Sequence, residues 1–213
     1  MKRSMVPGIA AVCAAAALCI AAGPGLFDAD SGISETQKKG AVEFSAANGE
    51  YRVTGAGGDI WGTSDGFHYV WKKIAGDMAI SADAQFTGTG AMAHRKAAVM
   101  IRQSLDPDSA YADAVVHGDG LTSLQFRPSA GAISQDIRVI AKSDVSAPVH
   151  LRIERRGDRF TVLAGKPGEA PTSVTSGAIA MQDPAYIGLA VSSHDPAVLE
   201  TVVFTNVAIE SLH

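Results

Sequence analysis

The sequence contains very little cysteine. Its 213 residues include only Cys13 and Cys19, and both lie inside the apolar run near the start of the chain. If this run is removed during export, no cysteine remains, which excludes a disulfide framework and thiol chemistry from the mature chain. Lipid attachment is not expected either, because Val12 and Leu18, rather than small residues, precede the two cysteines.

Concentrated positive charge is also missing. The chain carries 18 Lys and Arg against 22 Asp and Glu, a formal net charge of -4, and no run of Lys or Arg is longer than two. Proteins that bind nucleic acid present a concentrated basic face, so we expect no nucleic-acid partner. Intrinsic disorder is excluded as well, because 46% of the residues are hydrophobic.

The start of the chain has the parts of a secretory signal peptide. Lys2 and Arg3 supply positive charge, residues 9–22 form a run of apolar and small residues, and a Gly-Pro-Gly sequence interrupts that run. We therefore predict a signal helix over residues 1–25, with cleavage between about residues 21 and 29, and an exported protein, periplasmic or secreted. The alternative is an uncleaved anchor, which would make the membrane a partner.

Apolar and polar residues alternate over many short segments after a polar tether, which we expect over residues 26–40. Residues 78–87, for example, place apolar side chains on one face of a strand and polar side chains on the other. Turn residues separate such segments at intervals of about 8 to 12 residues, a spacing typical of a sandwich. Only residues 91–105 have a composition that also suits a helix. These features predict an all-β sandwich domain over residues 41–213. The predicted strands are 51–54, 67–74, 78–87, 97–104, 112–117, 121–127, 133–141, 149–154, 159–162, 185–192 and 202–209.

No motif establishes an enzymatic reaction. Residues 62–66 match the G-x-S-x-G pattern of a nucleophilic serine, but strand-like residues follow instead of a helix, so we interpret them as a turn. The six histidines form no H-x-H or H-x-x-x-H pair. Acidic residues two positions apart, which would bring glycosidase carboxylates about 5 Å apart on a strand, occur only in the tether and in a Pro-containing turn. We therefore predict no catalytic residue, no metal and no cofactor.

Several longer motifs have the pattern of a known family. They are DIWGTSDGFHYVW at 59–71, KAAVMIRQSLDPDS at 96–109, GLTSLQFRPSAG at 120–131, YIGLAVSSHDP at 186–196 and FTNVAI at 204–209. Over about Phe44 to Ile209, the chain resembles bacterial concanavalin A-like lectin/glucanase-type domains. The resemblance implies a jelly roll of two antiparallel sheets, in a family whose members often lack a defined reaction. Thr205 replaces an Asp of the family pattern, so a structural calcium ion gains no support.

Sugar recognition needs flat aromatic surfaces and polar groups that form paired hydrogen bonds. The candidate ligand-binding residues, which the resemblance places near one another, are Trp61, Trp71, Arg102, Gln125 and Arg127. Trp61 lies in a Gly-flanked loop and is expected to be exposed, whereas Trp71 belongs to an alternating aromatic set that is more typical of a core. Arg102 also fits an ion pair with Asp59 or Asp113.

Three functions fit this sequence. The leading hypothesis is an exported, non-catalytic module that binds carbohydrate or another glycan-like polymer at the bacterial envelope or exterior. The alternatives are a glycoside-processing enzyme, with carboxylates from separate strands such as Asp83, Asp113 and Glu154, and a structural partner of an envelope complex. A groove with exposed aromatic residues favours the first, two carboxylates in a pocket favour the second, and a flat apolar patch favours the third.

Overall fold

Fourteen β-strands and the turns between them make up the part of the chain that the computed structural model describes, residues 23–34, 37–87 and 92–212. This part contains no helix long and apolar enough to cross a membrane. Most of the signal helix expected over residues 1–25 lies outside the described residues. The strands are β1 (Ala29–Ile33), β2 (Ala41–Ser45), β3 (Glu50–Gly57), β4 (Phe67–Ile74), β5 (Met78–Thr87), β6 (Lys96–Arg102), β7 (Tyr111–His117), β8 (Thr122–Arg127), β9 (Gln135–Ile140), β10 (Val149–Arg156), β11 (Arg159–Gly165), β12 (Thr172–Thr175), β13 (Ala185–Ser192) and β14 (Asp195–Ser211).

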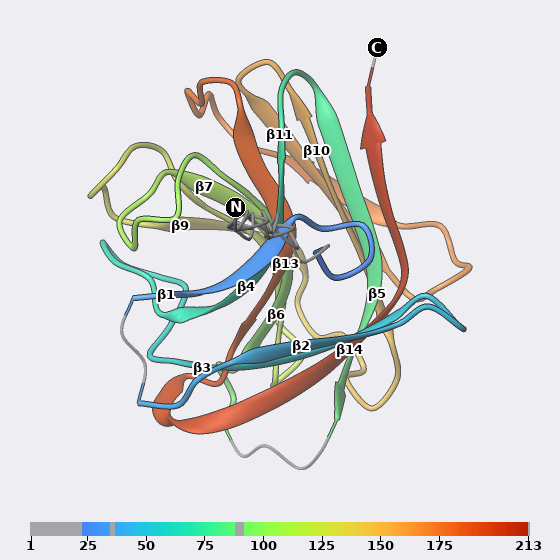
Figure 1. The fold of residues 1–213 in the computed structure, drawn as a ribbon. Helices are drawn as coiled ribbons and strands as arrows, with labels where there is room; N and C mark the ends of the chain where they lie inside the picture. Colours follow the sequence, from blue (N-terminus) through green and yellow to red (C-terminus); the bar gives the residue numbers. More distant parts are fainter. Residues whose placement is uncertain (1–22, 35–36, 88–91, 213) are drawn as a thin grey trace, which may run out of the picture.

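The strands form two antiparallel sheets of seven strands each (Figure 1). Sheet A has the order β1-β4-β13-β6-β7-β8-β9, and sheet B has the order β12-β11-β10-β5-β14-β3-β2. Strands that are neighbours in a sheet are often distant in sequence, since β13 lies between β4 and β6. The predicted all-β sandwich of two antiparallel sheets is confirmed.

β6 lies in the middle of sheet A, and its side chains alternate between two hydrophobic clusters. Ala97, Val99 and Ile101 belong to the large core cluster between the sheets, while Ala98 and Met100 belong to a second cluster. Successive side chains of a strand point to opposite faces, so the second cluster lies on the outer face of sheet A, the face turned away from sheet B. Burial on both faces makes the segment continuously apolar, and this is why its composition also suited a helix.

The second cluster also contains aromatic residues of β4. Phe67 and Tyr69 are fully buried there, as the alternating pattern predicts, and Ile60 of the preceding loop packs with them. Trp71 is only half-buried at the edge of this cluster. The outer face of sheet A is therefore partly a second core, and only the rest of it is free to bind a ligand.

The segment before residue 41 is not simply a tether. Residues 29–33 form β1, which pairs with β4 from Ala29 opposite Trp71 to Ile33 opposite Phe67, and Phe27 is buried in the main core. The expectation of a polar tether over residues 26–40 is therefore wrong for this part. An edge strand carries polar residues because much of it faces water, so composition hides it. The edge strand β2 and the short strand β12 were missed in the same way.

Candidate binding site

The loop at residues 58–66 folds back over the outer face of sheet A and brings several polar residues there. Its ends are held together, because Asp59 and Gly66 form a β-bridge in which the Gly66 N–H donates to the Asp59 carbonyl over 2.6 Å. Gly57 has a φ of 151°, and a Cβ atom at this position would lie 1.8 Å from the Gly66 carbonyl oxygen. The close approach of the backbone at residue 57, the end of β3, to residue 66, just before β4, therefore requires glycine at position 57. The G-x-S-x-G match lies within this loop, as the turn interpretation predicts.

A buried charge cluster ties this loop to the sheet. Asp65 accepts hydrogen bonds from both terminal nitrogens of Arg127, at 2.8 and 2.6 Å, and lies 3.5 Å from Arg102 Nη1. None of the three side chains is exposed to solvent. Burial raises the pKa of the Asp65 carboxyl, and the two guanidinium groups act against that rise.

Both arginines therefore have a structural role, and the prediction that Arg102 and Arg127 contact a ligand is wrong. Neither presents any surface to the outside. The expected ion pair of Arg102 with Asp59 or Asp113 is also wrong, because its partner is Asp65.

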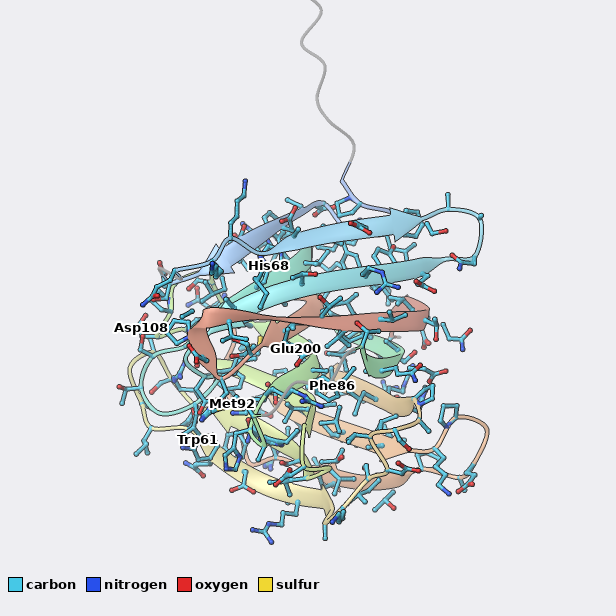
Figure 2. The ribbon with its side chains drawn as sticks, turned by 90° about the horizontal axis from the view of Figure 1, so that it is seen from below. Trp61, His68, Phe86, Met92, Asp108 and Glu200 are labelled. Carbon is cyan, nitrogen blue, oxygen red and sulfur yellow. The ribbon has the colours of Figure 1, made fainter. Side chains whose placement is uncertain are left out.

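A pocket of about 300 Å³ opens beside the loop, on the outer face of sheet A. It brings together Trp61 and Gln125, two of the predicted residues, with side chains that the sequence patterns did not single out. Trp61 lies at the periphery of the molecule, far from His68 (Figure 2). The residues that line the pocket are Asp59, Trp61, His94, Lys96, His117, Leu121, Gln125, Asp136, Arg138 and His194.

Lys96 is the charged centre of the pocket. Its ammonium group donates to Asp59 Oδ1 over 2.5 Å and to the Ile60 carbonyl over 2.8 Å, and it lies 5.7 Å from the centre of the Trp61 ring. The Lys96 side chain is only 3% exposed, so these contacts fix its position. A flat indole surface is thereby held next to a fixed ammonium–carboxylate pair.

His117 and Gln125 form a second fixed pair on neighbouring strands. His117 Nδ1 lies 2.9 Å from the Leu121 carbonyl, which can only accept, so Nδ1 carries the proton and Nε2 is free to accept. Gln125 Nε2 lies 3.4 Å from that Nε2 and donates to it. Burial and the nearby charge of Lys96 lower the pKa of His117 to about 4. His117 is therefore neutral near pH 7, and it orients the Gln125 amide.

Two further histidines complete the pocket. The ring of His94 lies 6.0 Å from that of His117 and 5.4 Å from that of His194, measured between ring centres. His194 has a φ of 61°, an uncommon value for a residue with a side chain, and such backbone conformations cluster at functional sites. Its Nδ1 atom is buried without a hydrogen-bond partner and lies 3.6 Å from Asp59 Oδ2.

Below the pocket lies a group of buried polar atoms without partners. They include both carboxylate oxygens of Asp113, the hydroxyl of Ser123 and the side-chain carbonyl of Gln125. Asp113 and Gln125 stand opposite each other on β7 and β8. Burial raises the pKa of the Asp113 carboxyl well above its ordinary value, and Lys96 acts against that rise. Within the described residues, no three His, Cys, Asp or Glu side chains are placed to hold a metal ion.

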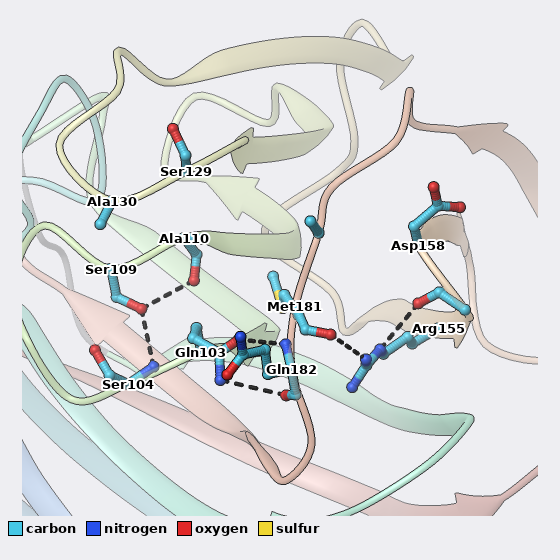
Figure 3. Close-up of a pocket in the computed structure, with 12 residues that line it drawn as sticks. Gln103, Ser104, Ser109, Ala110, Ser129, Ala130, Arg155, Asp158, Met181 and Gln182 are labelled. Carbon is cyan, nitrogen blue, oxygen red and sulfur yellow. Dashed lines mark hydrogen bonds between the residues drawn. The ribbon is translucent and has the colours of Figure 1, made fainter.

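A larger cleft of about 770 Å³ lies elsewhere, between residues 103–110 and residues 155–182 (Figure 3). Several of its polar groups are already paired within the protein. The Gln103 side chain donates to the Gln182 carbonyl and accepts from the Gln182 N–H, and Arg155 donates to the Met181 carbonyl. None of the unpartnered buried side-chain atoms found in the described residues belongs to it. The smaller pocket is therefore the better candidate.

Trp71 lies outside both cavities. Its Nε1 donates to Ser31 Oγ over 3.1 Å, and its ring packs edge-on against Tyr186 with the ring centres 5.1 Å apart. These contacts attach the edge strand β1 and the neighbouring strand β13 to β4, so the structure places Trp71 among packing residues, as its alternating position favours.

Comparisons with known proteins match the architecture but not the sequence. No family model matches the chain, and no curated protein matches it by sequence. A functionally unknown protein from Saccharomyces cerevisiae superposes with a TM-score of 0.66 at 13% identity, over 86% of this chain and 97% of that chain. The fold is a jelly-roll sandwich of two antiparallel sheets.

Two further matches are proteins that bind or process carbohydrate. The carbohydrate-binding module CBM66 from Bacillus subtilis gives a TM-score of 0.54 at 18% identity, over 85% of this chain and 95% of that chain. The alginate lyase from Klebsiella pneumoniae gives 0.50 at 12% identity, over 80% of this chain and 84% of that chain. Proteins of this fold therefore include carbohydrate binders and carbohydrate-processing enzymes, while membership of the sequence family stays a prediction.

Proposed function

We propose that this chain is a non-catalytic carbohydrate-binding module whose ligand lies in the pocket beside Trp61. The observation that carries the proposal is the position of the Trp61 ring, 5.7 Å from a buried ammonium group that is itself paired with Asp59. A sugar has an apolar ring face and polar edges. It can therefore stack on the indole while its hydroxyl groups reach the charged pair.

The pocket is rigid enough to bind without much rearrangement. Lys96 is fixed by two hydrogen bonds and Gln125 by His117, and Gln125 is only 5% exposed. Groups that are already ordered lose little entropy when a ligand binds. A volume of about 300 Å³ is at the lower end for small-molecule pockets, so we expect it to hold a short part of a glycan.

The positions of the carboxylates support binding over glycoside hydrolysis. Asp83 and Glu154 alternate with core residues of sheet B and face away from the sandwich interior, while Asp113 lies on the outer face of sheet A. These three carboxylates, which the enzyme hypothesis drew together, are thus on opposite sides of the molecule. Within the pocket, Asp59 is already paired with Lys96.

A glycan-array screen of the chain followed by titration of two variants tests the proposal. We expect Trp61→Ala to weaken glycan binding by about 1 to 3 kcal/mol, because the stacking surface is lost, with little change in stability. Trp71→Ala is the matched control, since this tryptophan lies outside the pocket, and it should bind as the parent does. Equal binding by the parent and Trp61→Ala would overturn the assignment of the pocket, and a parent that binds no glycan would favour the structural-partner hypothesis.

Export is a separate proposal that rests on the first 25 residues. If the signal peptide is removed, intact-mass measurement of protein from the periplasm or medium will give less than the 22.0 kDa of the full chain. Recovery of the full-length chain from the membrane would support the anchor instead.

A further inference from the structure

We infer that the ligand is a sugar that carries a hydrocarbon chain, such as an alkyl or acyl group, and that this chain lies on an exposed apolar surface beside the pocket. This inference rests on the proposed function and names the class of glycan. The surface consists of Met92 and residues 196–199, all of them exposed, and we call it the apolar rim.

Residues 196–199 form an irregularity in β14. Asp195 pairs with Gly57 and Glu200 pairs with Gly55, so four residues of β14 stand opposite a single residue of β3. Their sequence is Pro-Ala-Val-Leu, and all four residues are exposed. A run of four exposed apolar residues is a fault in a soluble domain unless it serves binding, and bulges are frequent beside functional sites. The irregularity therefore indicates a surface that a ligand covers.

The segment before β6 lies beside this irregularity. Arg95 and Glu200 form an ion pair, with 3.5 Å between Nε and Oε2. The rings of His94 and His194 lie next to each other, with 5.4 Å between their centres. Two segments that are about a hundred residues apart in the sequence are thus adjacent in space, and the first of them contributes Met92 to the rim.

The apolar rim adjoins one end of the pocket. His94 and His194 line the pocket, and each is two residues from a residue of the rim. The opposite end is charged, because Asp136 and Arg138 belong to the edge strand β9, which β7 and β8 separate from β6. A ligand that extends from the pocket of about 300 Å³ past the histidines therefore meets apolar side chains.

The charges around the pocket favour a neutral ligand. Its two permanent cations, Lys96 and Arg138, are matched by the carboxylates of Asp59 and Asp136. A fully apolar ligand would leave this polar lining without partners, which is unfavourable. A sugar without a substituent would leave the rim in contact with water. A neutral ligand with one polar end and one apolar end satisfies both surfaces.

Pairs of glycosides that differ only in the length of the alkyl chain test this inference. Methyl and hexyl β-D-glucoside, and methyl and hexyl β-D-galactoside, can be titrated by NMR below the concentrations at which the hexyl glycosides form micelles. Burial of one CH₂ group strengthens binding about fourfold, so the hexyl glycoside should bind roughly 4 to 15 times more tightly than the methyl glycoside.

Substitutions in the rim should remove this preference. Val198 and Leu199 are 49% and 45% exposed, so the double variant Val198→Ser/Leu199→Ser should keep the fold. We expect its ratio of hexyl to methyl affinity to fall to about 1 to 3, while the methyl glycoside binds as it does to the parent. Met92→Gln, on the other segment of the rim, should lower the ratio as well.

The matched control is Leu26→Ser, at a side chain that is 46% exposed. The Leu26 N–H donates to the Tyr51 hydroxyl, and Tyr51 lies at the other end of β3 from the residues that pair with Asp195 and Glu200. This variant should keep the full preference for the hexyl glycoside.

Equal affinity of the parent for the two glycosides, or an unchanged ratio in the double variant, would overturn the inference. If the methyl glycosides still bind in a Trp61-dependent way in that case, the proposed function stands. Hexyl binding that is the same in Trp61→Ala would show that the chain binds without the sugar, and it would overturn the inference too. A parent that sediments as a dimer and a double variant that sediments as a monomer would assign the rim to a second copy of the chain instead. If no glycoside of either kind binds, both proposals fail.

Discussion

Removal of the Asp65 carboxylate should destabilise the protein strongly. Asp65 accepts two hydrogen bonds from Arg127, at 2.8 and 2.6 Å, and lies 3.5 Å from Arg102, with all three side chains unexposed. Loss of its charge leaves two buried guanidinium groups without a counter-ion, and loss of one partner from a buried pair costs about 3 to 5 kcal/mol. Asp65→Asn keeps the shape and one acceptor, so we expect about 3 kcal/mol.

Urea unfolding and thermal melting measure this loss directly. For a domain of this size, about 3 kcal/mol corresponds to a fall in Tm of roughly 6 to 12 °C. Arg127 also donates to the Trp61 and Gly62 carbonyls, at 3.4 and 3.3 Å, so sugar binding should weaken as well. The control is Asp158→Asn, whose side chain is 57% exposed and 3.7 Å from Arg159. It should change stability by less than about 0.5 kcal/mol. An Asp65→Asn protein within about 1 kcal/mol of the parent would refute the reasoning.

Three further variants test other parts of the structure. Trp71→Ala should lower the free energy of unfolding by about 1 to 3 kcal/mol, measured in urea, because it loses ring packing against Tyr186 and the bond to Ser31. Asp113→Asn should gain stability relative to the parent as the pH rises above the ordinary carboxyl pKa, because a raised carboxyl pKa in the folded chain makes the parent lose stability in that direction. A stability difference that stays constant with pH would show that burial does not control this group. The pH dependence of stability has the opposite sign at His117. Between the ordinary pKa of 6.5 and the folded value of about 4, the unfolded chain binds more protons than the folded chain. The parent should therefore lose up to about 3 kcal/mol of stability as the pH falls through that range. His117→Gln should lack this part of the pH dependence in unfolding curves recorded from pH 4 to 7.

The strands with one buried face were predictable from sequence because burial leaves a period-two pattern. Residues 149–154 show it plainly, and they lie in β10, where buried and half-buried positions alternate. The edge strands do not show it, since only Ile33 of β1 and no residue of β2 is fully buried, and the accessible positions need not be apolar. Their pairing partners lie elsewhere in the sequence, so only the assembled sheet reveals them.

The candidate site was predictable only in part, for a similar reason. Trp61 was expected to be exposed because of its Gly-flanked loop; it is half-buried instead, and it lines the pocket with Gln125. An arginine on an alternating strand looks the same in sequence whether it meets a ligand or a buried carboxylate, and the partner of Arg127 is 62 residues away. The rings of His94 and His194 meet although no local spacing relates them.

The docking of β1 on β4 decides where a stable expressed fragment can begin. A fragment starting at residue 41, the start of the domain by composition, would lack the strand that pairs with β4 from residue 67 to residue 71. It would also lose Phe27 from the core. The bare edge of β4 would then offer unpaired backbone groups to any other chain, and such edges promote dimerisation and aggregation. Recombinant protein is therefore best started before Phe27, so that poor solubility of a shorter fragment is not mistaken for a property of the domain.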